Sequence, residues 1–374
     1  MSRIQNAIVY LVDLPIVRPH QLSMHTITTQ TVVFIKLTDE EGESGWGEAA
    51  TIGGASYEEM TPEAIKINLE QYFVPHLLRQ DPSSYGKLME TLHTRIKGNR
   101  FAKGAVESAL LDLYGKQVGL PVYQLLGGKR QNTLQTAWTL ASGDTSKDIE
   151  EAQEFLYQKR HNIFKLKIGS GNPMENVYHV LDIKKALGDN VRITVDVNQA
   201  WDEQIANECL PFLQDGGVAM VEQPLPDWNE EGMKRLTQKF SLSIMADESA
   251  RSIQDIFRIA KNHSADSISL KVPKHGGLME TKKAAAIAES AGLQLYGGTM
   301  IDTTLGTAAA AHIYATMPTF AFDTELFGPL LYQEQISFNT IKYENFQFRI
   351  PEGPGLGIEI DENKIIHYSR KIHL

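Results

Sequence analysis

The feature that most constrains the fold is a series of apolar, strand-like runs in the second two thirds of the chain. Amphipathic stretches fill most of the intervals between them, and the centres of the runs lie roughly 24 to 29 residues apart. This interval fits one strand and one helix, and eight such units close a parallel sheet into a (β/α)8 barrel. The eight runs are residues 136–141, 164–168, 193–197, 220–222, 244–247, 268–272, 294–297 and 320–325.

The first third of the chain has a different pattern, which is typical of an antiparallel sheet followed by helices. The strands expected there are residues 7–16, 31–37 and 43–49, and the expected helices are 62–78, 83–96 and 102–116. Loops are expected over residues 18–28 and 51–61. The predicted domains are an α+β capping domain (1–130), a (β/α) barrel domain (131–335) and a strand-like C-terminal segment (336–374) that returns to the capping domain.

Composition limits the kind of protein. The 374 residues, 42% of them hydrophobic, suffice for a barrel and an accessory domain. The formal net charge of -10, without a long basic run, argues against nucleic acid as a partner. No stretch approaches the ~20 apolar residues of a membrane span, and the N-terminus lacks the shape of a signal peptide. The single cysteine, Cys209, rules out an internal disulfide and a thiolate zinc cluster, and it favours a cytoplasmic location.

Two lysines, Lys165 and Lys167, lie in the strand-like run 164–168. Because alternate side chains of a strand point the same way, their ammonium groups share one face. If that face is enclosed, burial and mutual repulsion lower the lysine pKa values, so that Lys167 can act as a base near neutral pH. The alternative is a strand whose lysine stems extend along the surface to water.

Three carboxylates end the next three runs, and the C-terminal strand ends are where barrels carry their active sites. They are Asp196, Glu222 and Asp247. A lone Asp at a strand end is often a helix cap or a surface group, but three that converge repel one another unless a cation lies between them. Oxygen-only ligands suit Mg²⁺ or Mn²⁺. Glu248, next to Asp247, is expected to face the other way, as a supporting or merely structural residue.

Further charged residues complete the arrangement. Lys271, in the sixth run, is expected to lie across the barrel from Lys167, and Glu325 lies in the eighth run. A metal-bound substrate between the two lysines would then meet an acid or base on each face. This geometry suits removal of a proton next to a carboxylate, because metal and lysine charges stabilise the enediolate that forms.

With these residues identified, the sequence resembles the enolase superfamily, in its muconate-lactonizing subgroup. The resemblance rests on Lys165-x-Lys167, the three carboxylates and Lys271, and it extends to residues 18–24, 51–54, 297–300 and 324–329. It covers nearly the whole chain. It implies a barrel with an N-terminal capping domain, bound Mn²⁺ or Mg²⁺, and the interconversion of cis,cis-muconate and muconolactone. That reaction belongs to the bacterial degradation of catechol and other aromatic compounds through the β-ketoadipate pathway.

The resemblance also implies roles for individual residues. Lys167 protonates the enolate carbon in the lactonizing direction and removes the α-proton in reverse, while Lys165 assists electrostatically. Lys271 serves on the opposite face as a second acid or base, or as a positive charge. Glu325 meets the substrate or a metal-bound water. The implied metal ligands are Asp196, Glu222 and Asp247.

Loops of the first domain, around residues 20–25 and 52–57, are expected to close over the barrel mouth and select a small dicarboxylate; ordinary connecting loops are the alternative. Backbone N–H groups of residues 297–299 are expected to donate to a carboxylate, with a tight turn as the alternative. The expected substrate-binding residues are Ile52, Tyr57, Asn198, Gly298, Thr299 and Phe327. The resemblance further implies a homo-oligomer, an octamer.

Other activities share these lysines and metal ligands. Within the subgroup they are chloromuconate cycloisomerisation, dipeptide epimerisation and o-succinylbenzoate synthesis. An alternative from another class is a barrel that binds metal without catalysis and serves as a scaffold. The sequence leaves open the cation that is bound, the stereochemistry of the lactone and the preference between muconate and chloromuconate.

Overall fold

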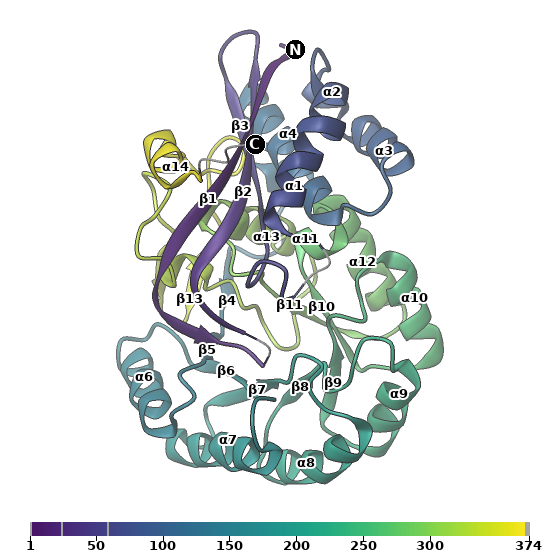
Figure 1. The fold of residues 1–374 in the computed structure, drawn as a ribbon, viewed down its shortest axis with the longest axis vertical. Coiled ribbons are helices and arrows are strands. Elements are labelled where there is room, and N and C mark those ends of the chain that lie inside the picture. Colours follow the sequence, from purple (N-terminus) through teal and green to yellow (C-terminus); the bar gives the residue numbers. More distant parts are fainter. Residues whose placement is uncertain (1, 24, 58–59, 371–374) are drawn as a thin grey trace.

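The computed structural model describes residues 2–23, 25–57 and 60–370. Figure 1 shows a unit of strands and helices at the N-terminus set against a barrel of parallel strands surrounded by helices. This confirms the predicted α/β barrel with its α+β capping unit. Predictions that fall on Met24, on Glu58 and Glu59, and on residues 371–374 lie outside the described residues.

The capping sheet is antiparallel and has the strand order β1-β2-β3. Its strands are β1 (Ile4–Gln21), β2 (Thr26–Asp39) and β3 (Ser44–Ala50). The loop predicted over 18–28 is largely wrong, because β1 continues to Gln21 and pairing resumes at His20 and Ile27 after an irregularity that begins at Pro15. The hairpin therefore extends to the barrel, where the Gln21 N–H donates to the Ala141 carbonyl at 3.3 Å.

Helices cover this sheet. The predicted helix 62–78 is a continuous run with one π-helical turn, and the helices of this region are α1 (Pro62–Asn68), η1 (Leu69–Phe73), α2 (Val74–Leu77), η2 (Pro82–Ser84), α3 (Tyr85–Arg95), α4 (Arg100–Val118) and α5 (Val122–Leu125). Helix α4 is buried on almost every side and packs against β3. Gly45 and Gly47 allow this close approach, since a Cβ at either would collide with the α4 backbone.

The described residues form a seven-stranded parallel barrel sheet in chain order. Its strands are β5 (Trp138–Leu140), β6 (Ile163–Lys167), β7 (Arg192–Asp196), β8 (Met220–Glu222), β9 (Ser243–Ala246), β10 (Ser267–Leu270) and β11 (Gln294–Gly297). The helices that follow them are α6 (Thr145–Tyr157), α7 (Pro173–Leu187), α8 (Glu203–Asp215), α9 (Glu230–Lys239), α10 (Ile253–Asn262), α11 (Val272–His275), α12 (Leu278–Ser290) and α13 (Thr304–Tyr314). Helices α6 to α10 and α12 lie outside the strands in Figure 1.

The eighth predicted run, 320–325, is not a strand. Thr324 alone pairs with both edges of the sheet, through single parallel bridges to Thr136 and Gly297. The side-chain hydroxyls of Thr136 and Thr324 also form a hydrogen bond with each other, at 2.8 Å. Asp323, with a φ of 62°, breaks the extended conformation just before this point. The barrel is thus closed by one residue in place of a regular strand.

The C-terminal segment is mostly irregular, so the prediction of strands over 336–374 is wrong for most of its length. Its elements, with the short turn before them, are η3 (Gly328–Leu330), β12 (Tyr343–Glu344), β13 (Gln347–Arg349) and α14 (Glu362–Tyr368). Strand β13 pairs with β4 (Thr133–Gln135). Helix α14 packs on β1, and Glu362 accepts hydrogen bonds from Tyr10 at 2.9 Å and Lys36 at 2.7 Å. The predicted domain limits themselves stay a prediction.

Among the described residues, no helix combines the length and the apolar character that crossing a bilayer requires.

Candidate active site

A small pocket lies at the C-terminal ends of the barrel strands, beneath the capping unit. The capping unit lines it with His20, Leu22, Ile52 and Tyr57, and the barrel with Lys167, Asn198, Lys271, Thr299, Ile301, Glu325 and Phe327. The space between these side chains is about 10 Å³, enough for about one water molecule. The pocket is therefore narrow and nearly filled by the side chains that line it.

Lys165 lies below the pocket and is completely enclosed. Its Nζ contacts the Glu222 carboxylate, lies 2.6 Å from Glu325 Oε2 and 3.7 Å from Asp196 Oδ2, and sits over the Tyr296 ring. Burial alone would lower the pKa of Lys165, but the carboxylates of Glu222 and Glu325 raise it well above its usual value. The prediction of a lowered pKa is wrong for Lys165. The carboxylates around it raise the pKa more than burial lowers it.

Lys167, at the end of β6, is the lysine of the pair that reaches the pocket. Its Nζ lies 2.5 Å from Asp196 Oδ2 and 3.2 Å from Asn198 Oδ1. The side chain is 10% exposed, against 1% for Lys165. The two lysines thus share a face, as predicted from the strand, but one is a buried counter-ion and the other faces the pocket.

Asp196 and Glu222 lie beside each other where β7 pairs with β8. Burial and the charge of Asp196 raise the pKa of Glu222 to about 8, although Lys165 opposes this. Burial would also raise the pKa of Asp196, but the ammonium groups of Lys167 and Lys165 hold it below its usual value. Within the described part of the chain, Glu222 Oε1 has no hydrogen-bond partner although it is buried.

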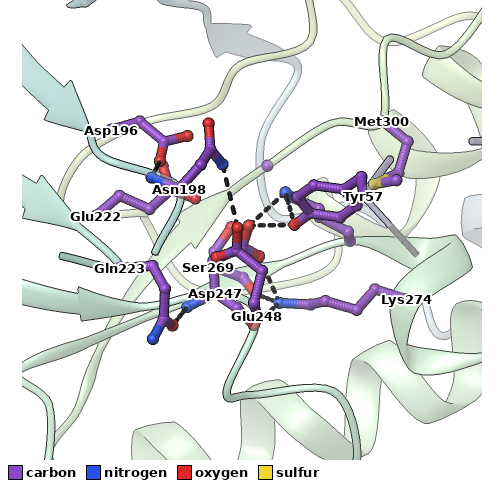
Figure 2. A network of polar contacts seen from close by, with 12 residues as sticks. Tyr57, Asp196, Asn198, Glu222, Gln223, Asp247, Glu248, Ser269, Lys274 and Met300 are labelled. Atoms are coloured by element: carbon purple, nitrogen blue, oxygen red, sulfur yellow. Dashed lines mark hydrogen bonds and ion pairs between the residues drawn. The ribbon is translucent and has the colours of Figure 1, made fainter. Parts of the chain in front are cut away.

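Asp247 is held by groups from three directions (Figure 2). Its Oδ2 accepts hydrogen bonds from Tyr57 and Lys271, each at 2.6 Å, and its Oδ1 accepts one from Lys274 at 2.7 Å. Burial would raise the pKa of Asp247, but the two lysines hold it well below its usual range. Sequence reasoning missed Lys274; its spacing of three residues from Lys271, one helical turn after a strand end, is the signal that could have identified it.

The alternation of a strand predicted that Glu248 faces away from the site, and this prediction is wrong. Glu248 Oε1 accepts a hydrogen bond from the Asn198 amide at 3.1 Å, and Figure 2 shows its carboxylate close to that of Asp247. Strand β9 ends at Ala246, so the two-residue alternation no longer applies to the residues that follow it.

Whether the three carboxylates fit a metal can be judged from their surroundings. Over the described ranges, no three His, Cys, Asp or Glu side chains stand as a ready-made metal site. The donor set nevertheless fits a divalent cation, because three buried carboxylates end consecutive strands and one buried oxygen of Glu222 lacks a hydrogen-bond partner among these residues. Lysines now neutralise them, so a cation would have to take over oxygens that Lys165, Lys167 and Lys271 contact.

Lys271 directly follows β10 and lines the pocket on the side opposite Lys167. Its Nζ also donates a hydrogen bond to the Tyr57 hydroxyl of the cap, at 3.0 Å. Burial would lower the pKa of Lys271, but Asp247 and Glu222 raise it above its usual value. Gly298 makes room for this lysine, since a Cβ there would lie 2.8 Å from Lys271 Cε.

The N–H groups of Gly297 and Gly298, at the end of β11, are used within the barrel, so the prediction that they donate to a ligand is wrong. Gly297 donates to the Asp323 carbonyl at 3.0 Å, and Gly298 donates to the Leu270 carbonyl at 2.8 Å. The first bond lies at the closure of the barrel, and the second continues the pairing of β10 with β11. Thr299 does reach the pocket, with its hydroxyl bonded to Asp302 at 2.9 Å.

The other predicted residues lie as follows. Glu325 accepts hydrogen bonds from Lys165 and from the Thr139 hydroxyl, each at 2.6 Å. Ile52 and Phe327 supply apolar wall. Three pocket residues were not predicted individually: His20 and Leu22, which lie in the segment 20–25 expected to close over the barrel mouth, and Ile301. The position of that segment at the pocket agrees with the prediction, and Ile301 carries no polar group that would have marked it.

Comparisons with known proteins agree over almost the whole chain. The model of the mandelate racemase / muconate lactonizing enzyme N-terminal domain matches residues 5–127, and the enolase C-terminal domain-like model matches residues 147–364. Muconate cycloisomerase 1 of Acinetobacter baylyi is 48% identical over 356 residues, covering 95% of this chain and 96% of the relative. Chloromuconate cycloisomerase CbnB of Cupriavidus necator is 40% identical over 360 residues, covering 96% and 97%.

A solved structure gives the same picture. The crystal structure of muconate lactonizing enzyme from Pseudomonas fluorescens complexed with muconolactone superimposes with a TM-score of 0.97. It is 46% identical to this chain, and the match covers 99% of this chain and 100% of the other.

Proposed function

The chain belongs to the mandelate racemase / muconate lactonizing enzyme family of the enolase superfamily, and from this we propose that it is a muconate cycloisomerase. Such an isomerase interconverts cis,cis-muconate and muconolactone. The relative of that name from Acinetobacter baylyi is more similar to the chain than the chloromuconate enzyme of Cupriavidus necator is, at 48% against 40% identity. This difference favours muconate over chloromuconate as the main substrate.

The observation that carries the proposal is the pocket. Lys167 and Lys271 line it from β6 and β10, on opposite sides of the barrel, and buried carboxylates lie on the strands between them. A planar substrate held there has one ammonium group at each face. This arrangement supports transfer of a proton to or from a carbon next to a carboxylate.

In the proposed mechanism, Lys167 gives a proton to the enolate carbon in the lactonizing direction and removes that proton in reverse. Its pocket position and its anchoring by Asp196 and Asn198 support this role. Lys271 contributes positive charge, or a second acid or base, at the other face. Lys165 stays below the substrate as a fixed positive charge, held by Glu325.

Enzymes of this family bind a divalent metal. Asp196, Glu222 and Asp247 would hold it here, and we propose Mn²⁺, or else Mg²⁺, as the cation. When bound, the cation supplies positive charge that stabilises a substrate carboxylate as it gains electron density. The cap excludes water from the site, because Tyr57 covers Asp247 and Lys271 and hydrogen-bonds to both.

We place the enzyme in the bacterial degradation of catechol and related aromatic compounds, in the cytoplasm, as a homo-oligomer. The single cysteine supports the location. Light scattering on the purified protein gives the number of subunits, and a monomeric mass would contradict the assembly.

The test of the activity is direct. Purified protein supplied with Mn²⁺ should consume cis,cis-muconate, followed as loss of absorbance, and should exchange the α-proton of muconolactone in D₂O. Chloromuconates and a dipeptide panel are assayed beside it. A higher kcat/KM for chloromuconates would assign the chloromuconate alternative, and α-proton exchange on dipeptides alone would assign an epimerase. Turnover of neither muconate nor chloromuconates would contradict the proposal.

A further inference from the structure

His20 is a buried polar residue in the wall of the active-site pocket, and the mechanism above does not use it. Its side chain is 1% exposed, and it lines the pocket together with Lys167 and Phe327. In the part of the chain that the structure describes, the buried Nδ1 atom of His20 has no hydrogen-bond partner. Leaving such a group unpaired costs about 1–3 kcal/mol, so this position calls for a ligand atom or a functional reason.

The ring is also held in place. His20 pairs with Ile27 at the far end of the β1–β2 hairpin, which fixes the backbone that carries it. The imidazole stacks on the Phe327 ring, with 6.4 Å between the centroids and 27° between the planes. The hairpin comes from the cap and Phe327 from the barrel, so the ring is set at the junction of the two.

The charge of the surroundings defines what the ring can bind. Burial, with the positive charges of Lys167, Arg18 and Lys165, holds the pKa of His20 well below its usual value, so the ring is neutral. A neutral imidazole has one N–H donor. The nearby lysines attract an anion, and an ionised carboxylate offers only acceptor atoms. A carboxylate oxygen at Nδ1 would therefore select the tautomer that carries its proton there.

We propose that His20 donates a hydrogen bond from Nδ1 to a substrate carboxylate on the cap side of the pocket, and so selects dicarboxylates. The inference rests on the proposed function. One carboxylate of the substrate has to lie by the barrel floor, where Lys165 and the metal-binding carboxylates are. A linear dicarboxylate then presents its second carboxylate toward the cap, which supplies His20.

The test uses inert ligands, so that it does not depend on turnover. Adipate and hexanoate have six carbons each, but only adipate has a second carboxylate. Their dissociation constants are measured by calorimetry on the Mn²⁺-loaded protein, for wild type and for three variants whose folding is checked by thermal unfolding. His20→Phe keeps the stacked ring and removes both nitrogens. His20→Asn places an amide near the position of Nδ1, and His20→Gln places it near that of Nε2.

Wild type should prefer adipate over hexanoate, and His20→Phe should reduce this preference by about tenfold or more, the usual effect of a hydrogen bond to a charged group. His20→Asn should restore most of the preference, and His20→Gln should not. An unchanged preference in His20→Phe would overturn the inference. So would an equal loss of affinity for both ligands, because this indicates only a structural role.

The two proposals fail separately. If muconate is turned over but the adipate preference does not depend on His20, only the inference about His20 is wrong. If the preference depends on His20 but neither muconate nor chloromuconates react, the dicarboxylate site stands and the proposed reaction is wrong.

Discussion

At the scale of single residues, the main result is the division of labour between two lysines of one strand. Lys165 and Lys167 are separated by one residue, yet the first is sealed between the carboxylates of Glu222 and Glu325 and the second faces the pocket. A buried charge is tolerated only when it is paired, so Lys165 is tied to the stability of the barrel floor. Lys167 can gain or lose a proton with less effect on stability than Lys165 can.

The two lysines should therefore respond differently to truncation. Lys167→Ala should lower kcat for muconate by about 10²- to 10⁴-fold with little change in thermal stability, because it removes the proposed acid and base from a strand end. Lys165→Ala should also destabilise the protein, by about 3–5 kcal/mol, because it leaves buried carboxylates unpaired. Muconate absorbance and denaturant unfolding measure these effects. A substantial residual rate in Lys167→Ala would contradict its assigned role.

A second prediction at this scale concerns the metal. Asp247→Asn should weaken Mn²⁺ binding by roughly tenfold or more, since an amide replaces an anionic ligand and Lys271 and Lys274 lose their counter-ion. Electron paramagnetic resonance of free Mn²⁺ gives the affinity. The exposed Asp189, changed to Asn, is the matched control for a lost negative charge. Equal affinities in both variants would argue against ligation by Asp247.

At the scale of elements, the loop between β11 and α13 shows how contacts from other parts of the chain shape the pocket. Ile301 lies in this loop with a φ of 59°, a strained conformation for a β-branched residue. Its carbonyl accepts a hydrogen bond from the Tyr332 hydroxyl at 2.5 Å. Thr303, at the start of α13, donates its N–H to Glu48 of β3 at 2.8 Å. Contacts from other elements thus hold a strained residue in the wall of the pocket.

Tyr332→Phe tests this support. Loss of the bond to the Ile301 carbonyl should destabilise the protein by about 1 kcal/mol and raise KM for muconate several-fold, with a smaller effect on kcat, because the pocket wall relaxes. Tyr10→Phe is the control: it also removes one hydroxyl hydrogen bond, to Glu362, but far from the pocket. Steady-state kinetics separates the two. An unchanged KM in Tyr332→Phe would contradict the prediction that this hydrogen bond positions the pocket wall.

At the scale of the whole molecule, the cap, the barrel and the C-terminal segment share buried side chains. His312 of α13 is an example: its Nδ1 accepts from the Tyr123 N–H at 3.1 Å, and its Nε2 donates to the Leu356 carbonyl at 3.1 Å. Both ring nitrogens are thereby used by a neutral imidazole that links three parts of the chain. Burial lowers the pKa of His312 to about 4.

This linkage predicts sensitivity to acid. The unfolded state takes up a proton near the ordinary histidine pKa of about 6.5, but the folded state does so only near 4, so stability is lost as the pH falls through this window. Protonation of His312 should lower the free energy of unfolding by about 2 kcal/mol when the pH falls from 7 to 5. His312→Asn should be less stable at pH 7 but lose less on acidification, as measured by denaturant unfolding at both values. The exposed His367→Asn should behave as wild type. An equal loss in His312→Asn and wild type would contradict the prediction.

Local sequence patterns were enough to predict the repeating strands, the charges at the strand ends and the family, because periodicity reports which face of an element is buried and a motif needs only nearby residues. They predicted the shared face of Lys165 and Lys167 for the same reason. Tertiary structure alone decided that Thr324 closes the barrel in place of a strand, that Glu248 turns inward after β9 ends, and that anions surround Lys165. It also decided that a paired strand, and not a loop, carries His20 to the pocket. Each of these outcomes depends on partners distant in the chain, such as Lys165 and Glu325, and local patterns carry no information about which distant residues will meet.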